Sequence, residues 1–209
     1  MRPSFVTFEG IDGSGKSSHL AIAASWFAER SIAVRVTREP GGTAVGSALR
    51  SIFLDPAHGR LDGTVEMLIV FAARRQNLVE VIEPALASGS HVLCDRFTDS
   101  TLAYQGYGRG LSLEQIHDVD RLATGGRRPD RTLLFDLPAG LARRRRDPQG
   151  EDRLDEEQVE FYERVRAGYL ALAALEPQRF RLIDSSGARQ ETAAQVRRAL
   201  SDLLEDTQA

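Results

Sequence analysis

The sequence predicts an α/β fold in which helices cover both faces of a five-stranded parallel sheet. Two observations lead to this prediction: five short apolar runs rich in β-branched or aromatic residues, and amphipathic segments of helical length between them. Strands that alternate with helices are joined by right-handed crossovers, so they pair in parallel. The chain has 209 residues, 42% of them hydrophobic, and no repeat or linker-like change in composition, so we expect one domain over residues 1–209.

The elements follow one another along the whole chain. Short length and β-branched or aromatic content predict the strands Ser4–Gly10, Ala33–Glu39, His91–Arg96, Arg131–Leu137 and Arg179–Asp184. Helical apolar spacing predicts the helices Ser17–Glu29, Ala44–Leu54, Val65–Ala87, Leu113–Thr124, Asp155–Leu175 and Ala188–Leu204. A basic and then turn-rich stretch, residues 142–153, predicts a surface flap. Ligands of such sheets bind beyond the carboxyl ends of the strands, where EGIDGSGKS, TREPGGT and CDRFTDS stand.

Composition excludes several classes of function. A net charge of −3 argues against broad binding to nucleic acid or to an anionic membrane, so an anionic partner needs a local cluster of arginines. Neither a signal-peptide pattern nor 18 consecutive apolar residues occurs, so we expect a cytoplasmic protein. Cys94 is the only cysteine, which excludes an intramolecular disulfide, and the four histidines lack metal-ligand spacing.

Residues 10–17 match the pattern G-x-x-x-x-G-K-[ST] between a predicted strand and a predicted helix, which is the setting of a P-loop. Backbone N–H groups of such a loop converge on phosphate oxygens, and the helix adds its positive N-terminal end. The predicted fold is therefore a P-loop NTPase three-layer sandwich. Its expected nucleotide-binding residues are Gly10, Ile11, Asp12, Gly13, Ser14, Gly15, Lys16, Ser17 and Ser18.

Lys16 is the only lysine in a chain with 26 arginines. A compact ammonium on a flexible stem fits between two phosphates as a point charge, whereas a planar guanidinium is broader and favours bidentate partners. We therefore expect Lys16 to reach the β- and γ-phosphates of a nucleotide, and the hydroxyl of Ser17 to ligate Mg²⁺.

The remaining motifs point to a small kinase. The guanine-binding motif N-K-x-D is impossible because the only asparagine, Asn77, precedes Leu78, and protein-kinase signatures are absent. Phosphoryl transfer requires positioning and charge neutralisation, so arginines beside the phosphates are expected. The sequence offers three groups of them: Arg38, Arg96, and the flap arginines 143–146 with Arg153.

The segments FEGIDGSGKS, TREPGGT, FAARRQ, CDRFTDSTLAYQGYGRG and RPDRTLLFDL together resemble the bacterial thymidylate kinase family, in order and spacing, over nearly the whole chain. The resemblance implies a nucleoside-monophosphate kinase fold with a helical lid, usually a homodimer. It also implies transfer of the γ-phosphate of ATP to dTMP, giving dTDP for dTTP synthesis, with Mg²⁺. Two alternatives stay open: a kinase for another nucleoside monophosphate or a deoxynucleoside, and a P-loop protein that binds nucleotide without catalysis.

The resemblance assigns roles around the phosphates. Asp12 matches the carboxylate that contacts the 3′-hydroxyl of the dTMP sugar, and Arg96 matches the arginine that binds its phosphate. Asp95 matches the acid associated with the magnesium site, beside Ser17. Gly13 stands where eukaryotic members carry an arginine, and the family variant lacking that arginine supplies one from the lid. The candidate lid residues are Arg143, Arg145, Arg146 and Arg153.

The resemblance also assigns roles around the acceptor. Its candidate residues are Arg38 and Glu39 with Pro40 fixing the turn, Thr101 and Gln105 reading the polar edge of thymine, and Arg50 and Arg74 in the pyrimidine pocket. One position departs from the family, because a stacking phenylalanine is usual four residues before Arg74 and Val70 stands there. Phe71 lies about 100° further around a helix. Either Phe71 reaches the base after a register change, which we favour, or Val70 packs on the base and Phe71 belongs to the core.

Two of these sets also have purely structural explanations. The flap arginines would form a solvated face in an arginine-rich chain, and Asp95 with Arg96 would form an ion pair at a strand end. The flanking segment DPQGEDR and the missing arginine at Gly13 favour the functional interpretation of the flap arginines as a group.

Overall fold

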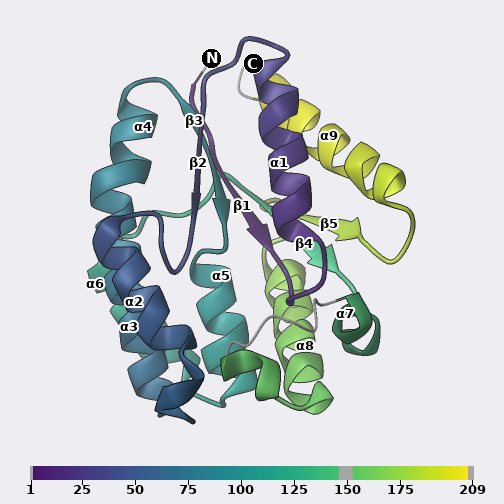
Figure 1. The fold of residues 1–209 in the computed structure, drawn as a ribbon. Helices are drawn as coiled ribbons and strands as arrows, with labels where there is room; N and C mark the ends of the chain where they lie inside the picture. The colour runs from purple at the N-terminus through teal and green to yellow at the C-terminus, as the bar shows by residue number, and fades with distance from the viewer. Residues whose placement is uncertain (1, 146–152, 207–209) are drawn as a thin grey trace.

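The computed structural model of the chain describes residues 2–145 and 153–206 (Figure 1). Its five strands are β1 (Phe5–Glu9), β2 (Val34–Arg38), β3 (His91–Asp95), β4 (Arg131–Asp136) and β5 (Phe180–Asp184). They form one sheet in the order β2-β3-β1-β4-β5, and every neighbouring pair is parallel. The predicted five-stranded parallel sheet is confirmed. From β1 the chain builds β2 and β3 on one side and then crosses β1 to add β4 and β5 on the other. This reversal of strand order opens the ligand-binding crevice of α/β sheets at the end of β1.

The helical elements are α1 (Lys16–Ala28), α2 (Ala44–Leu54), η1 (Pro56–His58), α3 (Gly63–Asn77), η2 (Leu78–Ile82), α4 (Glu83–Ala87), α5 (Thr98–Thr101), η3 (Leu102–Gly108), α6 (Leu113–Thr124), α7 (Ala139–Arg145), η4 (Arg153–Glu156), α8 (Val159–Leu175) and α9 (Arg189–Asp206). Helices α1 and α9 lie on one face of the sheet (Figure 1), where Trp26, Phe27 and Leu200 pack on Phe8 and Phe135. The remaining large helices cover the other face and its carboxyl edge. Helices on both faces confirm the predicted three-layer arrangement.

Three helical regions differ from the sequence-based expectation. The helix expected from Asp155 begins at Val159 as α8, after the separate turn η4. The segment expected as one helix from Val65 to Ala87 is α3, a π-helical turn η2, and α4. Residues 98–108 were not predicted to be helical, yet they form α5 and the π-helix η3. Gly108 explains the difference, because a Cβ there would lie 2.7 Å from Phe161 and 2.9 Å from Val165 of α8. Close packing against α8 therefore holds this segment helical despite glycines that lower its intrinsic propensity.

The expected flap is described in part. Its first residues belong to α7 and Arg153 begins η4, whereas Arg146 lies outside the described residues. Within the described ranges, no helix combines the length and the apolar character needed to cross a bilayer.

Candidate active site

The phosphate loop follows β1 and leads into α1, as the sequence predicts. Gly13 adopts φ +86°, and a Cβ added to it would overlap the carbonyl oxygen of Ala142 in α7. The N-cap of α1, Gly15, makes no side-chain capping hydrogen bond, so the first N–H groups of the helix have no side-chain cap. Open backbone donors at the positive end of a helix form an anion site.

Lys16 is buried at the floor of this loop. Its Nζ donates to the backbone oxygen of Ile11 at 3.0 Å and lies 3.8 Å from Oδ1 of Asp12. Burial, and then the nearby Arg96, lower the pKa of Lys16, while the carboxylates of Asp12 and Asp95 oppose that shift. The ammonium is thus held inside the loop, within reach of a bound phosphate chain.

Ser17 and Asp95 meet at the start of α1 and the end of β3. The Ser17 hydroxyl donates to Oδ2 of Asp95 at 2.6 Å, and Oδ1 of Asp95 is buried without a hydrogen-bond partner. A buried carboxylate oxygen with spare acceptor capacity beside a hydroxyl suits a hard cation such as Mg²⁺, which takes one or two protein ligands and completes its shell with phosphate oxygens and water. The described residues contain no group of three His, Cys, Asp or Glu side chains suited to a metal, so these two fit Mg²⁺ only together with a nucleotide.

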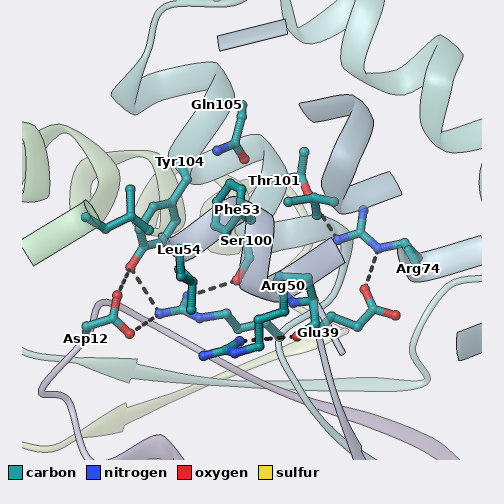
Figure 2. A pocket seen from close by; sticks show the side chains of 14 residues that line it. Asp12, Glu39, Arg50, Phe53, Leu54, Arg74, Ser100, Thr101, Tyr104 and Gln105 are labelled. Carbon is teal, nitrogen blue, oxygen red and sulfur yellow. Dashed lines mark hydrogen bonds and ion pairs between the residues drawn. The ribbon is translucent and has the colours of Figure 1, made fainter. Parts of the chain in front are cut away.

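A cavity of about 540 Å³, counting its open mouth, lies beyond the carboxyl ends of the strands (Figure 2). Its wall has the Asp12–Arg96 pair at one end, and apolar side chains together with the Arg74–Glu39 pair toward the other. The wall is formed by Asp12, Glu39, Pro40, Arg50, Phe53, Leu54, Val70, Arg74, Arg96, Ser100, Thr101, Tyr104, Gln105 and Leu154. Eight of these were predicted as site residues, and the structure brings them together around one space.

Arg96 occupies the polar end of the cavity. Its Nη2 donates to Oδ1 of Asp12 at 2.6 Å and to the hydroxyl of Tyr104 at 3.0 Å, and its Nη1 donates to the backbone oxygen of Gly10 at 3.0 Å. The Tyr104 hydroxyl in turn donates to Oδ2 of Asp12 at 2.9 Å. Arg96 has a positive φ of 70°, uncommon for a residue with a side chain, which marks a position where structure constrains the backbone.

Arg74 lies at the opposite end, fully buried. Its Nε donates to Oε2 of Glu39 at 2.6 Å and its Nη2 donates to Oγ1 of Thr101 at 2.9 Å (Figure 2), while its Nη1 is buried without a hydrogen-bond partner. Asn77 donates to the other oxygen of Glu39 at 3.0 Å. Burial raises the pKa of Glu39, and Arg74 opposes that shift. A spare guanidinium N–H in the cavity wall suits a ligand carbonyl.

Glu66 binds two of the predicted site residues although sequence reasoning assigned it no role. It accepts hydrogen bonds from Nε2 of Gln105 at 3.0 Å and from Nη1 of Arg153 at 2.7 Å, and it pairs with Arg109 at 2.9 Å. Arg153 also donates to the backbone oxygen of Phe53 at 3.1 Å. Arg153 therefore lies behind Phe53 in the apolar part of the cavity wall, away from the phosphate loop.

Val70 and Phe71 lie differently relative to the cavity. Val70 lines the cavity, whereas Phe71 is buried outside its wall with the guanidinium carbon of Arg74 4.6 Å from the centre of its ring. Helix α3 stays in α-helical register through both residues. The arrangement agrees with the alternative in which Val70 packs on the base and Phe71 belongs to the core, and not with the one that we favoured.

A second hollow lies on the other side of the phosphate loop. Arg145 at the end of α7 reaches it and donates to the backbone oxygens of Ser185 at 2.6 Å and Ser186 at 3.0 Å. His19 of α1 forms part of its wall and contacts the backbone oxygen of Gly15 at 2.8 Å. This hollow borders the loop after β5, so it suits the base and sugar of a nucleotide whose phosphates lie in the loop. Arg143 is exposed on α7.

Arg38 lies apart from the cavity that Arg96 and Arg74 line. It lines a third hollow together with Ser17 and Asp95, and its side chain packs on Gly41. Arg50, by contrast, lines the cavity with Arg96 and Arg74 and donates to the backbone oxygen of Pro40 at 3.2 Å. The two predicted arginines of this region thus face different sides of the turn after β2.

Comparison with known proteins agrees with this geometry. The family model for thymidylate kinase matches residues 8–196. Thymidylate kinases of Desulforudis audaxviator and Neisseria gonorrhoeae are each 47% identical to the chain, over 97% and 96% of it and over 92% and 97% of their own lengths. A crystal structure of thymidylate kinase from Ehrlichia chaffeensis superimposes with a TM-score of 0.79 at 32% identity, covering 96% of this chain and all of that one. The chain belongs to the thymidylate kinase family.

Proposed function

We propose that this chain transfers the γ-phosphate of ATP to dTMP and so gives dTDP for dTTP synthesis, with the division of roles set out below. One observation carries the proposal: the ion pair between Asp12 and Arg96 joins the phosphate loop to a cavity lined by both polar and apolar side chains. A donor site and an acceptor site that share one wall suit transfer between two nucleotides, because such transfer requires in-line positioning.

On the donor side, the loop from Gly10 to Ser18 binds the triphosphate of ATP through backbone N–H groups. Lys16 then neutralises charge on the β- and γ-phosphates. Ser17 and Asp95 hold Mg²⁺, which neutralises phosphate charge when it is bound. The buried, unpartnered Oδ1 of Asp95 supports this assignment.

On the acceptor side, Arg96 binds the phosphate of dTMP and Asp12 accepts a hydrogen bond from the sugar 3′-hydroxyl. Phosphate entry requires Arg96 to exchange its bond to Asp12 for bonds to phosphate oxygens, which leaves the Asp12 carboxylate for the sugar. Arg38 lines one hollow with Ser17 and Asp95, the proposed metal ligands, so its charge acts between the two phosphates. Glu39 and Pro40 hold the turn that separates them.

Thymine occupies the apolar end of the cavity. Thr101, Gln105 and the spare N–H of Arg74 face its polar edge, Arg50 closes the mouth, and Val70 packs on its face with Phe71 behind Arg74. The buried polar side chains would reject a base that leaves them unpaired.

Gly13 carries no charge where eukaryotic members have an arginine, so the lid arginines supply the positive charge near the phosphates. Arg145 is the described lid arginine beside the phosphate loop, and Arg143 and Arg146 belong to the same run. Arg153 acts from the acceptor side, through the shape of the thymine pocket. Closure of the lid excludes water and prevents hydrolysis of ATP.

We also propose a cytoplasmic homodimer whose protomers each form one domain. A sheet that joins strands from Phe5 to Asp184 supports the single domain. The packed helices α2 and α3 support the dimer, because they expose large apolar side chains at Val45, Ile52, Val65 and Leu68. Apolar surface of this kind marks interaction sites.

An acceptor panel tests the proposed reaction. ADP release is measured by a coupled assay with ATP and dTMP, dUMP, dCMP, GMP or thymidine in turn. We expect strong preference for dTMP. Equal or faster turnover of another acceptor contradicts the substrate assignment, and absence of acceptor-dependent ADP release contradicts the kinase assignment.

A further inference from the structure

Glu9 is the last residue of β1, and its side chain is completely buried behind the wall of the acceptor cavity. Its carboxylate accepts three hydrogen bonds: from the backbone N–H of Phe97 at 2.7 Å, from the hydroxyl of Ser100 at 2.5 Å, and from the hydroxyl of Tyr169 at 3.1 Å. These donors come from the end of β3, from α5 and from α8. One buried carboxylate thus ties together three elements that surround Arg96.

The same two hydroxyls contact Arg96. Its Nη1 lies 3.0 Å from Oγ of Ser100 and 3.1 Å from the Tyr169 oxygen, and the two hydroxyl oxygens are 2.7 Å apart. Each hydroxyl has one proton to donate and lone pairs to accept. Above the pKa of Glu9, about 7, the carboxylate is ionised, and the hydroxyl protons point toward it either directly or from Tyr169 through Ser100. Both hydroxyl oxygens are then left as acceptors for Arg96.

We propose that Glu9 is a positioning residue for recognition of the acceptor phosphate, because it orients the hydroxyls of Ser100 and Tyr169 that fix the guanidinium of Arg96. This inference rests on the proposed function, in which Arg96 binds the phosphate of dTMP. Glu9 itself does not line the cavity, so it acts through Arg96 and not on the substrate.

The backbone around Arg96 depends on the same carboxylate. Arg96 has φ +70°, and the peptide N–H that follows it donates to Glu9. The N–H of Arg96 itself donates to the backbone oxygen of Phe8, the residue before Glu9. Glu9 therefore holds both the main chain and the side chain of Arg96, and a guanidinium that is preorganised loses less entropy when it binds phosphate.

Glu9→Gln tests the inference, because it keeps the shape of the side chain and reverses one hydrogen bond. An amide NH₂ in place of Oε2 donates to the hydroxyls, which then turn their protons toward Arg96. We expect the dissociation constant of dTMP to rise about tenfold, as for loss of one hydrogen bond to a charged group. Thymidine lacks the phosphate, so its dissociation constant and that of ATP stay within about twofold by calorimetry.

Ser100→Ala and Tyr169→Phe provide independent arms in case Glu9→Gln does not fold. Each variant removes one hydrogen-bond acceptor of Arg96. The dissociation constant of dTMP should therefore rise about threefold to tenfold, and that of thymidine by less. Tyr107→Phe is the matched control, because Tyr107 packs on Gly168, the residue before Tyr169. It should leave the dissociation constants of both ligands unchanged.

The outcomes separate the inference from the proposed function. If Glu9→Gln weakens the binding of thymidine as much as that of dTMP, or changes the binding of neither, then Glu9 does not position Arg96 and the inference is overturned. Arg96→Ala reports on the proposed function itself. If that variant leaves the ratio of dTMP to thymidine affinity unchanged, Arg96 does not bind the phosphate and the assignment of its role is overturned first.

Discussion

Oδ1 of Asp12 lies 2.6 Å from Nη2 of Arg96, so a residue of the phosphate loop and the first residue after β3 form an ion pair across the crevice at the end of β1. The pair holds Arg96 in the cavity wall. An incoming phosphate must displace Asp12 from the guanidinium. The displaced carboxylate is then available for the acceptor sugar, which leads to the first prediction.

Asp12→Asn should remove most of the preference for a 3′-hydroxyl. We expect the ratio of kcat/KM for dTMP over its 3′-deoxy analogue to fall about tenfold, because a charged acceptor is replaced by a neutral amide. Steady-state kinetics with the two acceptors measure it. Thr101→Val is the control: it should lower both values together, since Thr101 is expected to contact the base. An unchanged ratio in Asp12→Asn contradicts the sugar contact.

Gly13→Ala should impair both stability and use of ATP. Its Cβ adds strain at φ +86° and overlaps the Ala142 carbonyl oxygen, so α7 must move away from the phosphate loop. Gly89→Ala is a matched control, because Gly89 has φ +85° and open space around it. Both variants should lose about 1–2 kcal/mol of unfolding free energy for the left-handed backbone. Gly13→Ala should lose further unfolding free energy, measured by urea unfolding, and should have a higher KM for ATP, measured by steady-state kinetics. If the two variants behave equally, the lid and the loop do not make a tight contact.

Stability should depend on pH through Glu9. Burial, and then the nearby Asp99, raise the pKa of Glu9 from 4.5 to about 7. The folded state therefore binds more protons than the unfolded state between these values, and the stability contributed by Glu9 falls as pH rises through this window. The titratable groups that face it are Lys16 on α1, Cys94 and Arg96 on β3 and after it, Asp99 on α5 and Tyr169 on α8.

Urea unfolding of the wild type and Glu9→Gln at about pH 5 and about pH 8 isolates this contribution. Gln cannot titrate, so the wild type should lose stability relative to the variant as pH rises, by on the order of 3 kcal/mol at most. A difference between the two proteins that stays constant with pH shows that Glu9 keeps an ordinary pKa.

The sequence predicted the fold well because the strands and long helices of this chain carry strong periodic patterns. Each predicted strand lies within a residue or two of the observed one, and α2 and α6 have the predicted bounds. The P-loop was equally predictable, since its function depends on backbone conformation that glycines encode locally. Both features depend mainly on short, local stretches of sequence.

Tertiary contacts determined the parts that the sequence did not predict. Residues 98–108 contain Gly106 and Gly108, so intrinsic propensity argued against the helix that α8 stabilises. Once that helix is known, Tyr104 falls four residues after Ser100 and Gln105 four residues after Thr101, which would have placed all four on the cavity side. Glu9 and Glu66 carry no local signal, because their roles arise from donors distant in sequence.

Leu68→Glu should dissociate the proposed dimer. Leu68 is 52% exposed on α3, one helical turn after the exposed Val65, and a carboxylate in a paired apolar face would be buried at high cost. Light scattering after size-exclusion chromatography should change from dimer to monomer. Leu122→Glu is the control, since Leu122 is 84% exposed on α6 and a charge there should leave the mass unchanged. A Leu68→Glu protein that keeps a dimeric mass places the interface elsewhere.

Arg145 and Arg153 should differ in which substrate they serve, although both belong to the basic flap segment. Arg145 bonds the backbone oxygens of Ser185 and Ser186 beside the phosphate loop, so Arg145→Ala should raise KM for ATP and lower kcat. Arg153 pairs with the fully buried Glu66 behind the acceptor cavity. Without Arg153, the buried Glu66 keeps Arg109 as its ion-pair partner but loses one charged hydrogen bond. Arg153→Ala should therefore cost about 2 kcal/mol of stability and raise KM for dTMP, with KM for ATP unchanged. Steady-state kinetics in which each substrate is varied in turn, together with urea unfolding, distinguish the two variants. A rise in KM for ATP in Arg153→Ala would show that this arginine reaches the donor phosphates instead.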